Sequence, residues 1–316
     1  MSVLLIGGGL VGSQIANILV GQGEDLTILD YSPQPDSLAD NVDSSKLRVM
    51  QGDILNPLDI TRALRESNAN QIIHTAAYPM LTIGAQENPY GAVQINIMGT
   101  VNVLEAARIH GVERVVAVSS GVLAMFWAGG EDNGESGKEE AYPRPTSFYA
   151  TTKQAVESLA HNYADFCGVD VRLVRYAAIA GPWRGRGGGG PSNVFRDMVE
   201  TAIRTGETSV APQSVEWVYS KDAAKGTVLA LQANNPKGRV FNVGTGTVTT
   251  PEDMADAVKA ALPATKVSVS GQKPTGGFAA VPLSMSRSKT EIGYEPSFDM
   301  AGAIRDYAEW YKNRKP

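Results

Sequence analysis

The chain has 316 residues, of which 43% are hydrophobic, and its formal net charge is -5. This length exceeds a typical domain of roughly 100–200 residues, so we expect one large domain with an appendage or two closely joined domains. The acidic charge balance offers no basic surface for nucleic acid or an anionic membrane, which leaves small soluble molecules as the expected partners.

The chain opens with a strand-like segment, VLLIG, and a helix pattern follows over residues 11–21. Because the apolar segment is only as long as a strand, we find no signal peptide in it. No stretch reaches the ~18 apolar residues that a bilayer span requires. We therefore expect no membrane contact and a cytoplasmic location.

Glycines between this strand and this helix predict a dinucleotide-binding turn. Gly7, Gly9 and Gly12 fit the pattern G-x-G-x-x-G. The first glycine permits a tight turn, the second lets a pyrophosphate approach the backbone, and the third lets helix and strand pack closely. The phosphates would lie at the helix N-terminus, where free N–H groups favour negative charge. The residues predicted to meet them are Gly7, Gly9, Leu10, Val11 and Gly12.

Asp30 ends the next strand, DLTILD, and bears on the choice between the two nicotinamide dinucleotides. Its carboxylate can accept hydrogen bonds from both ribose hydroxyls, whereas its charge would repel a 2′-phosphate. The following residues, Tyr31 and Ser32, supply no cation to offset that repulsion. We therefore predict NAD as the cofactor rather than NADP.

Strand-like and helix-like segments continue to alternate along the chain. The strand patterns LRVMQGD, QIIHTAA and VERVVAVSS are separated by helix patterns over 58–67 and 93–110, and a helix over 149–166 leads into VDVRLVRYAAI. Such βαβ units predict an α/β fold, a doubly wound parallel sheet with helices on both faces. His74 lies in an apolar strand, so we expect it to be a core histidine.

The regular alternation is lost beyond residue 180. We expect a Rossmann domain that binds NAD over residues 1–176 plus 213–244, and a smaller substrate-binding region over 177–212 plus 245–316. The single cysteine, Cys167, excludes an internal disulfide and a metal site built from several cysteines. We expect it to pack as a small apolar residue in its helix, and we expect no metal site.

Tyr149 and Lys153 stand four residues apart in SFYATTK, so both project from the same face of one helix. A tyrosine with an ordinary pKa near ~10 is a poor base at neutral pH. A nearby ammonium group and the positive nicotinamide ring would stabilise its phenolate. Ser120, after the strand VVAVSS, could then hold the reacting oxygen while Tyr149 transfers the proton.

These motifs together resemble an extended short-chain dehydrogenase/reductase of the NAD-dependent epimerase/dehydratase family. The similar pieces run in order from Val3 to about Gly246 and are GGGLVG, GDI, IIHTAA, INIMGTVNVLEAA, VVAVSS, YATTK, AIAGP and FNVGTG. The resemblance implies that Ser120, Tyr149 and Lys153 are the catalytic set and that Lys153 also contacts the nicotinamide ribose.

The same resemblance implies further contacts and an assembly. Asp53 and Ile54 would meet the adenine, Ala76 and Ala77 would line the cofactor path, and Asn96 would support the active-site helix. The apolar faces of helices 93–110 and 149–166 form a four-helix dimer contact in similar proteins. We therefore expect a homodimer.

The sequence departs from the family pattern on the substrate side. Ala178 stands where sugar-nucleotide epimerases usually have an asparagine, and Val215 where an arginine holds a diphosphate. The loop PWRGRGGGGPSN offers backbone N–H groups and arginines that could receive a carboxylate, or it is a surface loop without a ligand. We favour a small acidic or polyhydroxylated substrate. The residues expected to touch it are Tyr78, Ser120, Tyr149, Trp183, Arg184, Arg186, Ser192 and Asn193.

Three functions stay open at this point. A net dehydrogenase that oxidises a hydroxy acid or a sugar-like molecule releases NADH, and this is the function that we favour. A sugar-nucleotide epimerase or dehydratase returns the hydride to its intermediate and does not release NAD. A protein that senses NAD without catalysis would lack the tyrosine or the lysine, so the intact YATTK argues against it.

Overall fold

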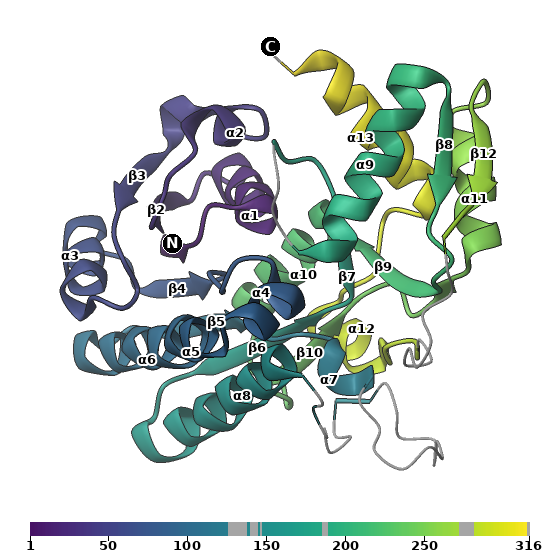
Figure 1. Cartoon of the computed structure of the whole chain (residues 1–316). Helices are drawn as coiled ribbons and strands as arrows, with labels where there is room; N and C mark the ends of the chain where they lie inside the picture. Colours follow the sequence, from purple (N-terminus) through teal and green to yellow (C-terminus); the bar gives the residue numbers. More distant parts are fainter. Residues whose placement is uncertain (126–137, 140–144, 146, 185–188, 272–280, 315–316) are drawn as a thin grey trace.

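The computed structural model describes residues 1–125, 138–139, 145, 147–184, 189–271 and 281–314. Seven parallel strands form its main sheet: β1 (Ser2–Ile6), β2 (Asp25–Asp30), β3 (Arg48–Gln51), β4 (Gln71–His74), β5 (Arg114–Val118), β6 (Val171–Tyr176) and β10 (Val240–Val243). Their order across the sheet is β10-β6-β5-β4-β1-β2-β3 (Figure 1). The predicted doubly wound parallel sheet is confirmed.

Helices cover both faces of this sheet. On one face lie α1 (Leu10–Gly21) and α10 (Ser220–Gln232), and on the other α3 (Pro57–Ser67), α6 (Gly99–His110) and α8 (Phe148–Cys167). The shorter helical elements are α2 (Pro35–Ala39), η1 (Ser44–Lys46), α4 (Leu81–Glu87), α5 (Pro89–Val93), the π-helical η2 (Gln94–Met98), α7 (Val122–Met125) and α12 (Ser286–Ile292).

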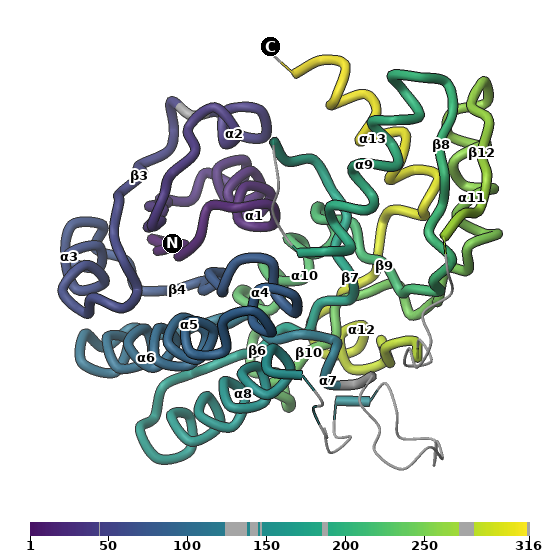
Figure 2. The backbone as a smooth tube through the Cα atoms, viewed as in Figure 1, coloured from purple at the N-terminus to yellow at the C-terminus, as the bar shows by residue number. Residues whose placement is uncertain are grey.

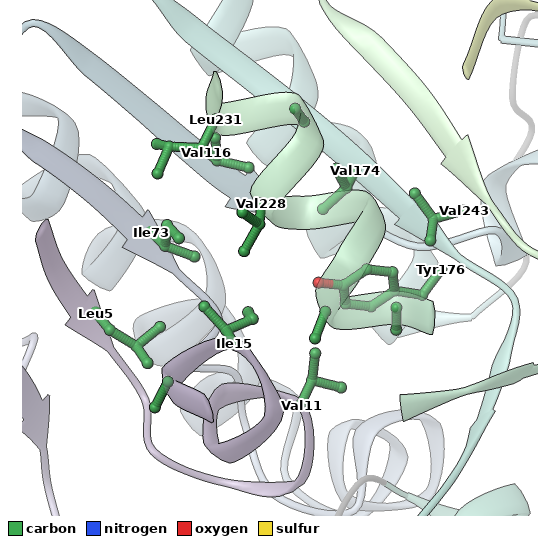
Figure 3. Close-up of a cluster of buried hydrophobic side chains, with 14 of the residues drawn as sticks. Leu5, Val11, Ile15, Ile73, Val116, Val174, Tyr176, Val228, Leu231 and Val243 are labelled. Atoms are coloured by element: carbon green, nitrogen blue, oxygen red, sulfur yellow. The ribbon is translucent and has the colours of Figure 1, made fainter. Parts of the chain in front are cut away.

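The apolar runs of the strands follow from this arrangement. Successive residues of a strand point to opposite faces, so a central strand with helices on both sides needs apolar residues at every position. In β1, Leu5 packs in the cluster that includes Ile15 of α1 and Val228 of α10, while Leu4 packs in the cluster under α3, α6 and α8. Figure 3 shows Ile15 and Val228 pointing toward Leu5 and Ile73 of the sheet.

A smaller region lies to one side of the main sheet (Figure 1). It holds a three-stranded sheet and a two-stranded sheet, and aromatic rings fill its core. The Phe195 ring lies 5.6 Å from that of Tyr307 and 6.0 Å from that of Trp217, measured between centroids. Its elements are β7 (Ala178–Ala180), α9 (Gly190–Thr205), β8 (Glu207–Val210), β9 (Val215–Tyr219), β11 (Val248–Thr249), α11 (Pro251–Ala261), β12 (Lys266–Val269) and α13 (Met300–Asn313).

The structure differs from the sequence-based expectation in two places. Of the strands within 213–244, only β10 joins the main sheet, whereas β9 pairs with β7 and β11 because Trp217 and Tyr219 pack in the smaller core. The proposed domain boundaries stay a prediction. Cys167 is exposed rather than packed, because the fully buried positions of α8 end at Ala160 and Cys167 is the last residue of the helix.

Candidate active site

The turn between β1 and α1 is shaped by its three glycines. Gly7 has a φ of 102°, and a Cβ there would lie 2.7 Å from Oγ1 of Thr75. A Cβ on Gly12 would lie 2.0 Å from the carbonyl oxygen of Gly7, so only glycine lets helix and turn pack this closely. A Cβ on Gly9, the N-cap of α1, would meet no protein atom within 4 Å. This open cradle at a helix N-terminus fits the pyrophosphate of a dinucleotide.

Asp30 is held at the edge of the same turn. Its carboxylate accepts hydrogen bonds from the backbone N–H groups of Gly8 at 2.7 Å and of Ser32 at 2.8 Å. Each carboxylate oxygen has a further lone pair, so both can still accept a ribose hydroxyl. Tyr31, which is exposed, lines the same pocket.

A single pocket of about 960 Å³ connects this turn to the predicted catalytic residues. Its volume is at the upper end of the roughly 300–1,000 Å³ that is typical of ligand pockets. The structure thus brings together most residues expected to bind cofactor and substrate. Those that line the pocket are Gly7, Gly9, Leu10, Val11, Gly12, Asp30, Asp53, Ile54, Ala76, Ala77, Tyr78, Ser120, Tyr149, Lys153 and Trp183.

Ser120, Tyr149 and Lys153 meet beyond the carboxyl end of β5. The hydroxyl of Tyr149, which is buried, forms a hydrogen bond with Ser120. The ammonium nitrogen of Lys153 lies 5.8 Å from the centre of the Tyr149 ring and donates a hydrogen bond to the carbonyl oxygen of Val118 at 2.8 Å. These contacts place a hydroxyl pair and a cation on one wall of the pocket.

Burial dominates the titration of both groups. It raises the pKa of Tyr149 to about 12, although the hydrogen bond with Ser120 acts in the opposite direction. It lowers the pKa of Lys153 to about 8, against the attraction of the Glu157 carboxylate. In the protein alone, therefore, burial outweighs the hydrogen bond that favours the phenolate, and the tyrosine pKa is raised.

Asn96 connects the active-site helix to the loop after β4. Its side-chain oxygen accepts a hydrogen bond from the backbone N–H of Tyr78 at 2.7 Å, and its side-chain nitrogen donates to Oγ1 of Thr152 in α8 at 3.0 Å. Asn96 is buried within the π-helical η2, where the wider turn lets the amide reach both neighbours. The geometry agrees with the implied role of this residue in supporting α8.

A buried carboxylate that we did not expect from the sequence lies one helical turn beyond Lys153. Glu157 accepts hydrogen bonds from Oγ of Ser119 at 2.5 Å and from Nε and Nη2 of Arg175 at 2.8 and 2.7 Å. These contacts join α8 to the ends of β5 and β6. Two signals were available, since Glu157 stands four residues after Lys153 and Arg175 lies in an apolar strand, where a charge needs a partner.

Glu216 is a second missed carboxylate, fully buried in the wall of the pocket. It accepts hydrogen bonds from the backbone N–H groups of Thr245, Gly246 and Leu283 at 2.9, 2.8 and 2.6 Å. Burial raises its pKa. Because all three donors are backbone groups, Glu216 fixes two chain segments at the substrate end of the pocket.

Several residues expected to touch substrate are engaged elsewhere. Arg184 pairs with the carboxylate of Asp40, and Ser192 donates to the carbonyl oxygen of Ile179 at 2.7 Å. Asn193 contacts the sulfur of Met80. None of these three lines the pocket, so their positions do not support substrate contact. Arg186 lies outside the described residues.

The histidine in the sheet is not an acid or base of this site. His74 is buried, with Nε2 3.1 Å from Oγ1 of Thr100. Burial lowers its pKa to about 3, so the ring is neutral at physiological pH. It is a core histidine, as predicted.

In the part of the chain that the structure describes, no group of three or more His, Cys, Asp or Glu residues could hold a metal. The helices in this part of the chain are too short or too polar to span a bilayer.

Comparison with known proteins agrees with this geometry. Residues 3–244 match the NAD dependent epimerase/dehydratase family. The chain is 26% identical to a putative UDP-glucose 4-epimerase of Methanocaldococcus jannaschii over 98% of both chains. It is also 26% identical to the UDP-glucose 4-epimerase of Mycolicibacterium smegmatis, covering 97% of this chain and 96% of that one. The solved UDP-glucose 4-epimerase of Thermus thermophilus in complex with NAD is 27% identical, covers 99% of each chain and has a TM-score of 0.83.

Proposed function

The chain belongs to the NAD dependent epimerase/dehydratase family, and from this premise we propose that it moves a hydride between NAD and a carbinol carbon of its substrate. Membership confirms two expectations, that the protein is an enzyme of this family and that its cofactor is NAD. The observation that carries the proposal is the common pocket, in which Ser120 and Tyr149 face the glycine turn that fits the dinucleotide.

Each catalytic residue has a role that its position supports. Ser120 holds the substrate oxygen by a hydrogen bond, and Tyr149 takes up or returns the proton of that oxygen. Lys153, fixed by Val118, holds a positive charge beside the tyrosine ring. Bound NAD supplies the hydride acceptor and, when oxidised, a second positive charge. Both positive charges lower the pKa of Tyr149 and so counteract the effect of its burial.

The relatives favour a nucleotide-linked sugar as the substrate. The relatives from Methanocaldococcus jannaschii and Mycolicibacterium smegmatis are a putative and a named UDP-glucose 4-epimerase, and the Thermus thermophilus structure is also a UDP-glucose 4-epimerase. We therefore place epimerisation, in which the hydride returns to the opposite face of the keto sugar and NAD is not released, ahead of the net dehydrogenation that the sequence alone led us to favour.

Net dehydrogenation of a smaller substrate is the second candidate, and one observation favours it. Ala178 and Val215, which replace an asparagine and an arginine of the family pattern, both line the pocket. Among the described residues that line it, Lys153 is the only lysine or arginine. This wall offers few contacts to a diphosphate.

Incubation with a panel of substrates separates the two candidates. UDP-glucose, UDP-glucuronate and several hydroxy acids are each mixed with enzyme and NAD. Proton NMR detects the 4-epimer, and absorbance detects NADH that accumulates beyond the amount of enzyme. Epimerisation predicts a 4-epimer of a UDP-sugar without free NADH. Accumulation of NADH with a hydroxy acid, and no epimer from either UDP-sugar, would contradict epimerisation and favour the second candidate.

A further inference from the structure

The segment 182–184, which follows β7, lies beside α2, the short helix between β2 and β3 of the main sheet (Figure 2). Nε and Nη2 of Arg184 both donate to the carboxylate of Asp40, the second at 2.8 Å. On the other side of the segment, the amide of Asn41 donates to the carbonyl oxygen of Pro182 at 3.4 Å. Asn41 in turn accepts a hydrogen bond from Gln14 of α1 at 2.9 Å. Both ends of segment 182–184 are therefore held by hydrogen bonds to Asp40 and Asn41, which directly follow α2.

Trp183 lies between these two anchors and is buried, with 6% of its surface exposed. It lines the main pocket, and it shares a second, small cavity with Gly8, Gly9 and Asp30. These partners belong to the turn that fits the pyrophosphate and to the carboxylate that faces the ribose. The space directly over Gly9 is open, since a Cβ there would meet no atom within 4 Å outside its own turn of the chain. The indole thus forms a wall at the cofactor end of the pocket rather than at the substrate end.

We propose that Trp183 is a cofactor-contact residue and that Asp40 and Arg184 are the positioning pair that holds it over the phosphate-binding turn. In this arrangement Trp183 and Arg184 serve the cofactor, whereas the sequence led us to expect both at the substrate. Asp40 and Arg184 form a bidentate ion pair, and the Asp40 side chain is only 7% exposed. The pair therefore fixes both the orientation of segment 182–184 and its distance from α2.

The consequence is a long residence time for the cofactor. NAD that lies between Trp183 and the glycine turn dissociates when segment 182–184 moves away from α2, and that movement breaks the ion pair. An enzyme that returns the hydride to the same substrate gains from a cofactor that exchanges slowly. The inference rests on one part of the proposed function, the binding of NAD in this pocket, and needs no knowledge of the substrate.

Dissociation of NADH from the intact protein tests the proposal. The protein is loaded with NADH and mixed rapidly with excess NAD, and energy transfer from tryptophan to NADH reports the dissociation rate. Arg184→Ala and Asp40→Asn should each raise this rate about tenfold, the loss expected for a charged hydrogen bond. Arg184→Lys keeps the charge but cannot form the bidentate contact, so its dissociation rate should lie between those of the wild type and Arg184→Ala. The matched control is Arg48→Ala, which removes the exposed ion pair between Arg48 of β3 and Glu66 of α3.

Two further readouts complete the test. The wild-type rate should rise with salt more steeply than that of Arg184→Ala, because salt screens the pair. Asp40→Arg combined with Arg184→Asp should restore slow dissociation. Unchanged rates in Arg184→Ala and Asp40→Asn, or an equal rise in Arg48→Ala, would overturn the inference while leaving the proposed function intact. Failure of the wild-type protein to bind NADH would instead overturn the proposed function itself.

Discussion

Glu157→Gln is the substitution that most directly tests the buried network behind the active site. The change replaces one carboxylate oxygen with an amide nitrogen and keeps the shape of the side chain. In the wild type, both carboxylate oxygens accept hydrogen bonds from Arg175, at 2.8 and 2.7 Å, and one also accepts from Ser119. The amide nitrogen cannot accept, so at least one of these bonds is lost and Arg175 keeps a charge without its counter-ion.

The expected loss of stability is large because both partners are buried. The side chains of Arg175 and Glu157 are 3% and 9% exposed. Removing one partner of a buried ion pair typically costs about 3–5 kcal/mol. Denaturant unfolding should therefore show a loss of this size for Glu157→Gln. Adding Arg175→Met should recover part of it, because the unpaired charge is then absent as well.

A second effect concerns Lys153, the proposed catalytic lysine. The Glu157 carboxylate raises the pKa of Lys153 against burial, and the balance of the two is about 8. Without that carboxylate the lysine loses its proton at a lower pH, so the alkaline limb of the turnover profile should move toward neutral pH. Glu105→Gln, which removes an exposed partner of Arg108, is the matched control and should leave the limb unchanged. An unfolding free energy and a pH profile equal to the wild type in Glu157→Gln would refute this reasoning.

Three further predictions concern the cofactor, catalysis and assembly. Asp30→Ala with Tyr31→Arg should shift binding toward NADP, because it removes the repulsion of the 2′-phosphate and adds a cation; a wild-type preference for NADP in a binding titration would contradict this. Lys153→Met should lower both turnover and NAD affinity, whereas Ser120→Ala should lower turnover less, since water can replace its hydrogen bond; equal kinetics in the two variants would argue against separate roles. Light scattering at micromolar concentration should show a homodimer formed through α6 and α8, and a monomer would contradict it.

The nucleotide half of the site was predictable because its geometry is local. A tight turn, a close helix and a carboxylate at the end of the next strand each depend on a few neighbouring residues. Gly7, Gly12 and Asp30 therefore lie where the spacing placed them. The four-residue spacing of Tyr149 and Lys153 is likewise a property of one helix. Such features can be inferred without knowledge of the tertiary structure.

Features that depend on distant contacts could not be inferred in this way. The partner of Arg184 is Asp40, 144 residues away, and no spacing or periodicity relates the two. In the same way, β9 and β10 have similarly apolar sequences, and only the packing of Trp217 into the smaller core assigns β9 to the other sheet. Glu157 and Arg175 could each be noticed in the sequence, but no spacing shows that they pair with one another.

The central claim is that Tyr149 transfers the proton during hydride transfer to NAD. Tyr149→Phe keeps the ring and its packing but removes the hydroxyl that bonds to Ser120. The most direct measurement is the turnover rate with the first active substrate, compared between wild type and Tyr149→Phe, together with the NAD affinity of each. Turnover in Tyr149→Phe should fall roughly 10²–10⁴-fold, with NAD affinity nearly unchanged. Wild-type turnover in this variant would contradict proton transfer by Tyr149.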